Sequence, residues 1–331
     1  MSAHPSVPLS EVAARAGALT VRPATLGDVE AICALVNEVD LGDIGVAESG
    51  PDEIREDLRG VTDLTRDSWL AWAGDRLVTY GLLWDDYGSE RIGIDHHVPR
   101  DQLAAGLHVL DLMTARAAEV AAANGAAEAV VHLHLTPNSL LTEEALPARG
   151  WRAIRRHHVL TRPVSVEGDP VPTPPAGVTP RPALTDDDQR SVHHVLTTAF
   201  RDDWDNHPQT YDAWRERVGA DRLDWSLVWI AALDGVDQAC CLGINTRETM
   251  GWVRGLGTLP AARGKGLASY LLRVAFAEFA ARGRHTVGLG VDTENATGAL
   301  GLYTGLGMTL HFAADTWELR LPVASTGTDP G

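Results

Sequence analysis

The residues best suited to hold a phosphate lie in a glycine-rich segment, residues 255–268, with the sequence GLGTLPAARGKGLA. An apolar strand is predicted to end within this segment and a helix to begin at Gly266. Glycines such as Gly264 and Gly266 let a backbone approach an anion closely and leave amides unpaired at a helix N-terminus, where the helix dipole favours negative charge. Arg263 and Lys265 add fixed positive charge. The alternative is a glycine-rich turn with surface cations, and both the G-x-G-x-x-G register and the Walker A sequence are missing.

A second polar element follows a predicted apolar strand farther along the chain. It begins with Asp292-Thr293-Glu294-Asn295 and continues into a predicted helix, residues 296–305, that carries Tyr303. Together the two segments resemble the GNAT superfamily of acetyl-CoA-dependent N-acyltransferases. The Arg/Gln-x-x-Gly-x-Gly/Ala loop of that family is matched by Arg263, Gly266 and Ala268, and its Asn…Leu-Tyr-x-x-x-Gly element by Asn295, Leu302, Tyr303 and Gly307.

The resemblance implies a site for acetyl-CoA as the acyl donor. In this family the strand before the loop splays from its neighbour at a bulge, and its backbone amides hold the pantetheine arm and polarise the thioester carbonyl. The Tyr that Tyr303 matches typically donates a proton to the departing thiolate, which suits a phenol at neutral pH. The residues expected to bind the cofactor are Gly257, Thr258, Leu259, Arg263, Gly264, Lys265, Gly266, Leu267, Ala268 and Asn295.

The group that removes a proton from the attacking amine is less clearly marked. Related tandem GNATs, including the mycothiol synthase group, often carry a Glu near the start of the strand before the loop, and the matching position here is Trp252. Glu248 is the nearest carboxylate and is the predicted general base. Asp292, Glu294 and a chain of water molecules are the alternatives.

Acidic and aromatic residues after the first predicted helix of the second half form the expected acceptor site. Carboxylates beside an aromatic ring suit a cationic amine, although the same run of residues is also typical of a solvated loop. The predicted substrate residues are Asp202, Asp203, Trp204 and Trp252.

These segments belong to the second of two similar copies in the chain. Val21-Arg22-Pro23-Ala24 opens the first copy and Pro180-Arg181-Pro182-Ala183 the second, and near the two ends Asn138 precedes Gly150, as Asn295 precedes Gly307, by 12 positions. Each copy is predicted to contain a strand, two helices, three strands, a long helix, a strand, a helix and a strand. This order gives an α/β fold with a mixed sheet.

In the second copy the sequence marks the ends of the predicted helices and strands more clearly. Thr185 and Asp188 form a candidate capping box for its first helix. The strand before the glycine loop is expected over 251–259 and the long helix over 266–282.

The predicted organisation is therefore two tandem GNAT acyl-CoA N-acyltransferase domains. The ranges are a flexible tail over 1–18, a degenerate N-terminal domain over 19–163, a proline-rich linker over 164–177, a catalytic domain over 178–322 and a flexible tail over 323–331. In the first domain Gln102 aligns with Arg263, Ala105 with Gly266, Leu107 with Ala268, and Leu146 with Tyr303. The phosphate loop is damaged there and the general acid is missing, so catalysis is expected in the second domain alone.

The composition limits which binding partners and which cellular compartment are expected. The net charge of −17 argues against nucleic-acid binding, and no apolar run is long enough to span a membrane. Cys33, Cys240 and Cys241 fit neither a disulfide framework nor a metal site, so a cytoplasmic protein without a bound metal is expected. The expected assembly is a monomer or a homodimer.

The sequence thus predicts an enzyme that acetylates the primary amine of a small molecule. Two alternatives remain: an N-acetyltransferase that acts on proteins or peptides, and a noncatalytic acyl-CoA-binding scaffold.

Overall fold

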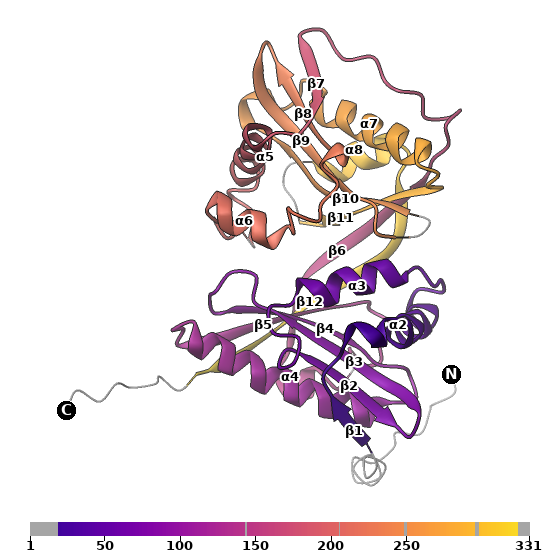
Figure 1. The fold of residues 1–331 in the computed structure, drawn as a ribbon, viewed down its shortest axis with the longest axis vertical. Coiled ribbons are helices and arrows are strands. Elements are labelled where there is room, and N and C mark those ends of the chain that lie inside the picture. The colour runs from indigo at the N-terminus through magenta and orange to yellow at the C-terminus, as the bar shows by residue number, and fades with distance from the viewer. Residues whose placement is uncertain (1–18, 143, 205, 248–249, 295–297, 324–331) are drawn as a thin grey trace, which may run out of the picture. The chain divides into compact units, whose positions relative to one another are not determined.

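The computed structural model describes residues 19–142, 144–204, 206–247, 250–294 and 298–323, which fall into two compact units (Figure 1). The described part of the first unit runs from residue 19 to Arg156 and resumes at Ala314, and the second unit comprises His157–Ala313. Residues 1–18 and 324–331, where tails were predicted, lie outside the described residues.

The first copy of the repeat follows the predicted order with one exception. Its elements are β1 (Leu19–Arg22), α2 (Val29–Asp43), α3 (Pro51–Gly60), β2 (Ser68–Ala73), β3 (Arg76–Trp84), β4 (Arg91–His97), α4 (Leu103–Ala123), β5 (Glu128–Leu135) and β6 (Arg152–Pro163). Among the residues described between β5 and β6 there is only a 3-10 turn, Pro147–Arg149. The helix predicted at that point is therefore wrong, because Pro147 and Gly150 bound a segment too short for an α-helix.

The second copy has every predicted element. These are β7 (Val178–Pro182), α5 (Asp186–Ala199), α6 (Tyr211–Arg217), β8 (Val228–Leu233), β9 (Val236–Ile244), β10 (Met250–Thr258), α7 (Leu267–Ala281), β11 (Thr286–Asp292), α8 (Ala299–Gly305) and β12 (Thr309–Pro322). The predicted capping box begins α5: the Asp188 amide donates to Thr185 Oγ1 at 3.2 Å, and the Thr185 amide donates to Asp188 Oδ2 at 3.1 Å.

The described strands of the first unit lie in the order β1-β2-β3-β4-β5-β12, and those of the second unit in the order β6-β11-β10-β9-β8-β7. Each unit contains one parallel pair, β4 with β5 and β10 with β11, beside antiparallel neighbours. The mixed α/β fold predicted from the sequence is confirmed.

The last strand of each copy does not close the sheet of its own copy. Residues 157–163 of β6 pair with β11 in the second unit, from His157 opposite Asp292 to Pro163 opposite Thr286. Residues 315–322 of β12 pair with β5 in the first unit, from Asp315 opposite Leu135 to Pro322 opposite Glu128. The compact units therefore differ from the contiguous ranges 19–163 and 178–322, because the repeat ends with a strand that joins the other sheet.

Helices cover both faces of each sheet, and each face has its own apolar core. In the second unit α7 packs one face with Phe276 and Phe279, whereas α5 and α6 pack the other face with Val192, Val195 and Trp214. In the first unit the corresponding layers are α4 on one face and α2 with α3 on the other. The two-faced covering explains why the central strands are apolar on both sides.

The packing of Phe279 on β10 gives a test of this core. A Cβ added at Gly251 would lie 2.3 Å from the Phe279 ring, which is fully buried. Gly251→Ala should therefore lower the free energy of unfolding of the second unit by about 1–3 kcal/mol through overpacking. The measurement is urea unfolding followed by tryptophan fluorescence. Gly290→Ala on the neighbouring strand is the control, because an added Cβ there meets nothing within 4 Å. Equal stability of the two variants would contradict the packing described.

Candidate active site

The central feature of the second unit is the point at which β10 leaves β11. The two strands pair in parallel from Met250 opposite Thr286 to Val253 opposite Leu289, and no pairing follows. Pairing with β9 continues to Thr258, but its register shifts between Val253 and Gly255, so Arg254 is an extra residue on β10. A bulge bends the strand that carries it. The far half of β10 is thus hydrogen-bonded on one side only.

The direction of the β10 amides follows from the pairing that remains. The Leu259 amide donates to the Gln238 carbonyl on the β9 side, at 2.8 Å. Since successive residues in an antiparallel strand direct their backbone groups to opposite sides, the Thr258 and Leu256 amides face the side that β11 has left. Of the three strand residues predicted to contact the cofactor, Thr258 directs its amide to this opening, whereas Gly257 and Leu259 direct theirs to β9.

Thr258 also presents a side-chain group without a partner. Its hydroxyl oxygen is buried and makes no hydrogen bond within the protein. A buried hydroxyl without a partner is costly, so a ligand that bonds to it stabilises the site.

The glycine loop between β10 and α7 has the geometry of an anion cradle. Gly264 and Gly266 adopt φ angles of +76° and +79°, which non-glycine residues rarely adopt. Gly266 is the N-cap of α7 and receives no side-chain capping bond, so the first-turn amides of this helix are open to a ligand. Lys265 is exposed on the loop, while Leu267 is buried beneath it.

Arg263 is exposed, and one hydrogen bond ties it to α5. Its Nη2 donates to the carbonyl of Ala199 at the end of α5, at 3.2 Å. The guanidinium therefore links the glycine loop to α5, which packs over β10: a Cβ added at Gly257 would lie 3.3 Å from the Ala199 Cβ.

Tyr303 lies on α8 within the core beneath α7. Its side chain is 8% exposed. Burial, followed by the nearby Cys241 thiol, raises the pKa of Tyr303 to about 12. The phenol consequently keeps its proton at neutral pH. Asn295, predicted on the same element, lies outside the described residues, as does Glu248, the predicted base.

The alternative bases are at the end of β11. The Asp292 carboxylate accepts a hydrogen bond from the Glu294 amide at 2.9 Å, which closes the turn after the strand. Asp292 therefore has a structural role in this turn.

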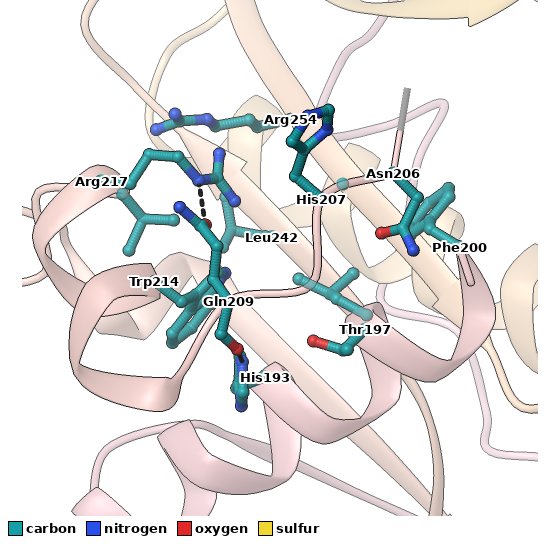
Figure 2. A pocket seen from close by; sticks show the side chains of 13 residues that line it. His193, Thr197, Phe200, Asn206, His207, Gln209, Trp214, Arg217, Leu242 and Arg254 are labelled. Atoms are coloured by element: carbon teal, nitrogen blue, oxygen red, sulfur yellow. Dashed lines mark hydrogen bonds between the residues drawn. The ribbon is translucent and has the colours of Figure 1, made fainter. Parts of the chain in front are cut away.

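A pocket of about 200 Å³ opens beside the far half of β10, on the face covered by α5 and α6 (Figure 2). Gly255 and Arg254 line it from β10, and Leu242 lines it from β9. The opposite walls come from the helices and the segment between them: His193, Leu196, Thr197, Phe200, Asn206, His207, Gln209, Trp214, Arg217 and Val218.

The pocket differs from the acceptor site predicted from the sequence. Asp202, Asp203 and Trp204 follow α5 but do not line it, and both aspartates are exposed. Trp252 also lies outside the lining, with its ring 4.6 Å from the Arg247 guanidinium carbon. The lining residues come from separate segments of the chain, and no local motif marks them.

Two polar side chains of the lining, His193 and Arg217, are oriented by oxygen atoms of Gln209. His193 Nε2 is 3.0 Å from the Gln209 backbone oxygen, and Arg217 Nε donates to Gln209 Oε1 at 2.6 Å. Burial lowers the pKa of His193, so this ring is neutral near pH 7.

The corresponding region of the first unit lacks the cradle. Five residues separate β4 from α4, whereas eight separate β10 from α7. Gln102 is the N-cap of α4 and thus occupies the place of Gly266, not that of Arg263 as the sequence alignment predicted. The β3–β4 pairing also runs without a register shift from Tyr80 opposite His97 to Trp84 opposite Gly93.

Side chains cross the gap where β4 leaves β5. Arg100 Nη2 donates to the Asp43 carboxylate at 3.1 Å and to the Asn138 carbonyl at 2.8 Å. Thr136 Oγ1 donates to the same carboxylate at 3.1 Å. These bonds connect α2 with the segments that follow both strands.

His97 and Asp95 form an ion pair on β4 of the first unit. His97 Nε2 is 2.9 Å from Asp95 Oδ2. Burial lowers the pKa of His97, but the Asp95 carboxylate outweighs it and raises the pKa to about 9. Among the described residues, no group of three or more His, Cys, Asp or Glu side chains is placed to hold a metal ion.

Two parallel strands separate here beside a glycine loop at a helix N-terminus. This arrangement is typical of acyl-CoA N-acyltransferases. Residues 190–308 match the Acetyltransferase (GNAT) family. A mycothiol acetyltransferase from Tsukamurella paurometabola is 33% identical over 215 residues, which cover 60% of this chain and 69% of that protein. Another from Frankia casuarinae is 31% identical over 185 residues, and the match spans about half of each chain, 51% and 52%.

Solved structures share the fold over nearly the whole chain. A GCN5-related N-acetyltransferase from Sphaerobacter thermophilus has a TM-score of 0.75 at 24% identity and covers 94% of this chain and 99% of its own. A tandem GNAT protein from the clavulanic acid biosynthesis pathway has a TM-score of 0.63 at 15% identity, covering 94% and 100%. The chain belongs to the GNAT acetyltransferase family. No helix in the described ranges is long and apolar enough to cross a membrane.

The positive φ of Gly266 gives a test of the loop. Gly266→Ala forces a Cβ into the left-handed region, which costs about 1–2 kcal/mol and displaces the first-turn amides of α7. The affinity for CoA, measured by calorimetry, should fall by about tenfold. Gly60→Ala in α3 is the control, because an added Cβ there meets nothing within 4 Å and needs no unusual φ. An unchanged affinity in Gly266→Ala would remove the loop from the CoA site.

Proposed function

We propose that this chain transfers the acetyl group of acetyl-CoA to the primary amine of a small molecule, and that the second unit performs the reaction. One observation carries the proposal: β10 leaves β11 after Val253, beside both the glycine loop and the pocket under α5 and α6. A donor along the opening and an acceptor in the pocket would meet at Gly255.

The protein groups at the opening suit the donor. Acetyl-CoA supplies a thioester, whose carbonyl carbon is the electrophile. We expect the open amides of Leu256 and Thr258 to hold the pantetheine arm and to stabilise negative charge on the carbonyl oxygen. The amides around Gly266, with Lys265, suit the pyrophosphate.

Tyr303 is the proposed general acid. The amine nitrogen forms a bond to the carbonyl carbon, the carbon–sulfur bond breaks, and the sulfur takes the phenolic proton of Tyr303. The attacking amine loses a proton to a base, for which Glu248 remains our proposal. Burial raises the pKa of Tyr303 to about 12, so its phenol holds a proton at neutral pH that it can donate to the departing thiolate.

The pocket favours a small acceptor over a protein or peptide. A volume of about 200 Å³ holds a compact amine. A noncatalytic scaffold would release no CoA thiol with any amine, so turnover assays separate that alternative directly.

Replacing the proposed acid tests the mechanism. Tyr303→Phe should lower kcat by about 10²–10⁴-fold, with little change in the affinity for acetyl-CoA, because only the transferable proton is removed. The assay follows release of the CoA thiol across a panel of amines. Tyr270→Phe is the control, since Tyr270 is buried in the same core and lies on α7. A normal kcat in Tyr303→Phe would exclude Tyr303 as the acid, and CoA binding without turnover on any amine would overturn the proposed activity.

The raised pKa of Tyr303 also predicts the alkaline side of the pH profile. An acid must be protonated to donate, and a pKa of about 12 keeps Tyr303 protonated well above the ordinary tyrosine value of 10. At saturating substrate, kcat should therefore show no fall with a midpoint near pH 10. The measurement is kcat between pH 7 and pH 10.5. A fall centred near pH 10 that disappears in Tyr303→Phe would contradict the buried setting of this residue.

A further inference from the structure

Two glycines stand at the same level on the two sides of the opening between β10 and β11. The last parallel pair is Val253 with Leu289. On β10 the bulge inserts Arg254, so the next residue in register is Gly255. On β11 the next residue is Gly290. The two glycines therefore mark the narrow end of the opening, where the strands begin to separate.

Both glycines face the side of the sheet on which α5 packs. A Cβ added at Gly255 would lie 3.5 Å from Leu196 on α5. On β11, Leu289 and Val291 belong to the core beneath α7, so Gly290 between them faces the opposite side. At this level neither of the two strands that border the opening carries a side chain on the α5 side.

The space in front of Gly290 is open. A Cβ added there meets no described atom within 4 Å, and the residue is exposed although β6 pairs with it on one side. Val159 of β6 lies directly opposite Gly290 and so shares its face. Two positions earlier on β11, a Cβ added at Gly288 would lie 2.9 Å from the Trp252 ring. Val159 and Trp252 are only partly buried, so an open floor lies beside two apolar side chains, which suits an alkyl group.

The narrow end is also where the proposed donor would place its acyl group. The glycine loop follows the far end of β10, so a pyrophosphate at Gly266 directs the pantetheine arm along β10 toward Val253. Between Thr258 and Gly255 the strand advances by about 10 Å. Because the opening closes at the Val253 pair, the thioester would stop at the level of the two glycines.

We propose that the donor site also takes acyl-CoA thioesters longer than acetyl, with the acyl group lying over Gly290 and against Val159. The proposal rests on the acetyltransferase function proposed above and extends its donors to short linear acyl groups. The chemistry is unchanged: the amine loses a proton to the base, its nitrogen bonds to the acyl carbonyl carbon, the carbon–sulfur bond breaks, and the sulfur takes the proton of Tyr303. Any side chain at position 290 would occupy the space that the longer acyl group needs.

A series of acyl-CoA thioesters tests the proposal. The full chain is titrated by calorimetry with CoA, acetyl-CoA, butyryl-CoA and hexanoyl-CoA. Each methylene that the protein covers tightens binding by up to about fourfold, so we expect butyryl-CoA to bind at least as tightly as acetyl-CoA. A butyryl-CoA affinity about threefold or more below that of acetyl-CoA would overturn the proposal.

Variants at Gly290 then locate the acyl group. Gly290→Leu fills the open space and should weaken hexanoyl-CoA binding by about tenfold or more, with little change for acetyl-CoA. Gly290→Ala should give a smaller loss in the same direction, and its ratio of the two affinities decides if the leucine variant binds no donor. Gly60→Leu in α3 is the control, because an added Cβ there also meets nothing within 4 Å. A ratio that no Gly290 variant changes would overturn the proposal, and a rise in the KM of the amine alone would assign the space to the acceptor.

Thiol release with a panel of amines, measured in parallel, separates this proposal from the proposed function. Binding of hexanoyl-CoA that depends on Gly290, without thiol release from any donor, would refute the acetyltransferase function alone. Thiol release from acetyl-CoA by a protein that excludes butyryl-CoA would refute the longer-donor proposal alone.

Discussion

The extra residue on β10 at Arg254 is the constraint on which the second unit depends. It shifts the pairing with β9 at the level where pairing with β11 stops. Because the strand continues with one neighbour only, the Leu256 and Thr258 amides face an opening instead of a ladder. The same shift places Gly255 beneath α5, where a Cβ would lie 3.5 Å from Leu196. The donor opening and the pocket wall are thus produced by one backbone irregularity.

The first unit shows the same fold without this irregularity. Its β3–β4 pairing is regular, its loop to α4 is shorter, and Arg100 bonds across the end of the gap between β4 and β5. Strand separation alone therefore does not produce the arrangement found in the second unit. The glycine loop and the bulge supply the open amides, and the first copy has neither.

Local patterns predicted the elements around the proposed site. The helix expected over 266–282 is found at Leu267–Ala281, the strand expected over 251–259 at Met250–Thr258, and the Thr185 capping box is present. These features depend on neighbouring residues, namely the loop glycines and the apolar period. The sequence could not predict which strands β6 and β12 pair with, because the sequence of a strand specifies its two faces and not its partner. The pocket was missed for a similar reason: its lining residues come from α5, α6, β9 and β10, and they line one pocket only through the packing of the helices on the sheet.

The exchanged strands have a consequence for synthesis. β5 needs residues 315–322 as its neighbour, so the sheet of the first unit stays open until β12 has left the ribosome. Tandem domains ordinarily fold one after the other as they emerge. Here the first domain to be translated is completed last, and the second domain requires β6, which is translated before its own first strand. A cut in the segment 164–177 would give two fragments, each holding the strand that the other lacks, so reassembly of the two fragments is expected in place of independent folding.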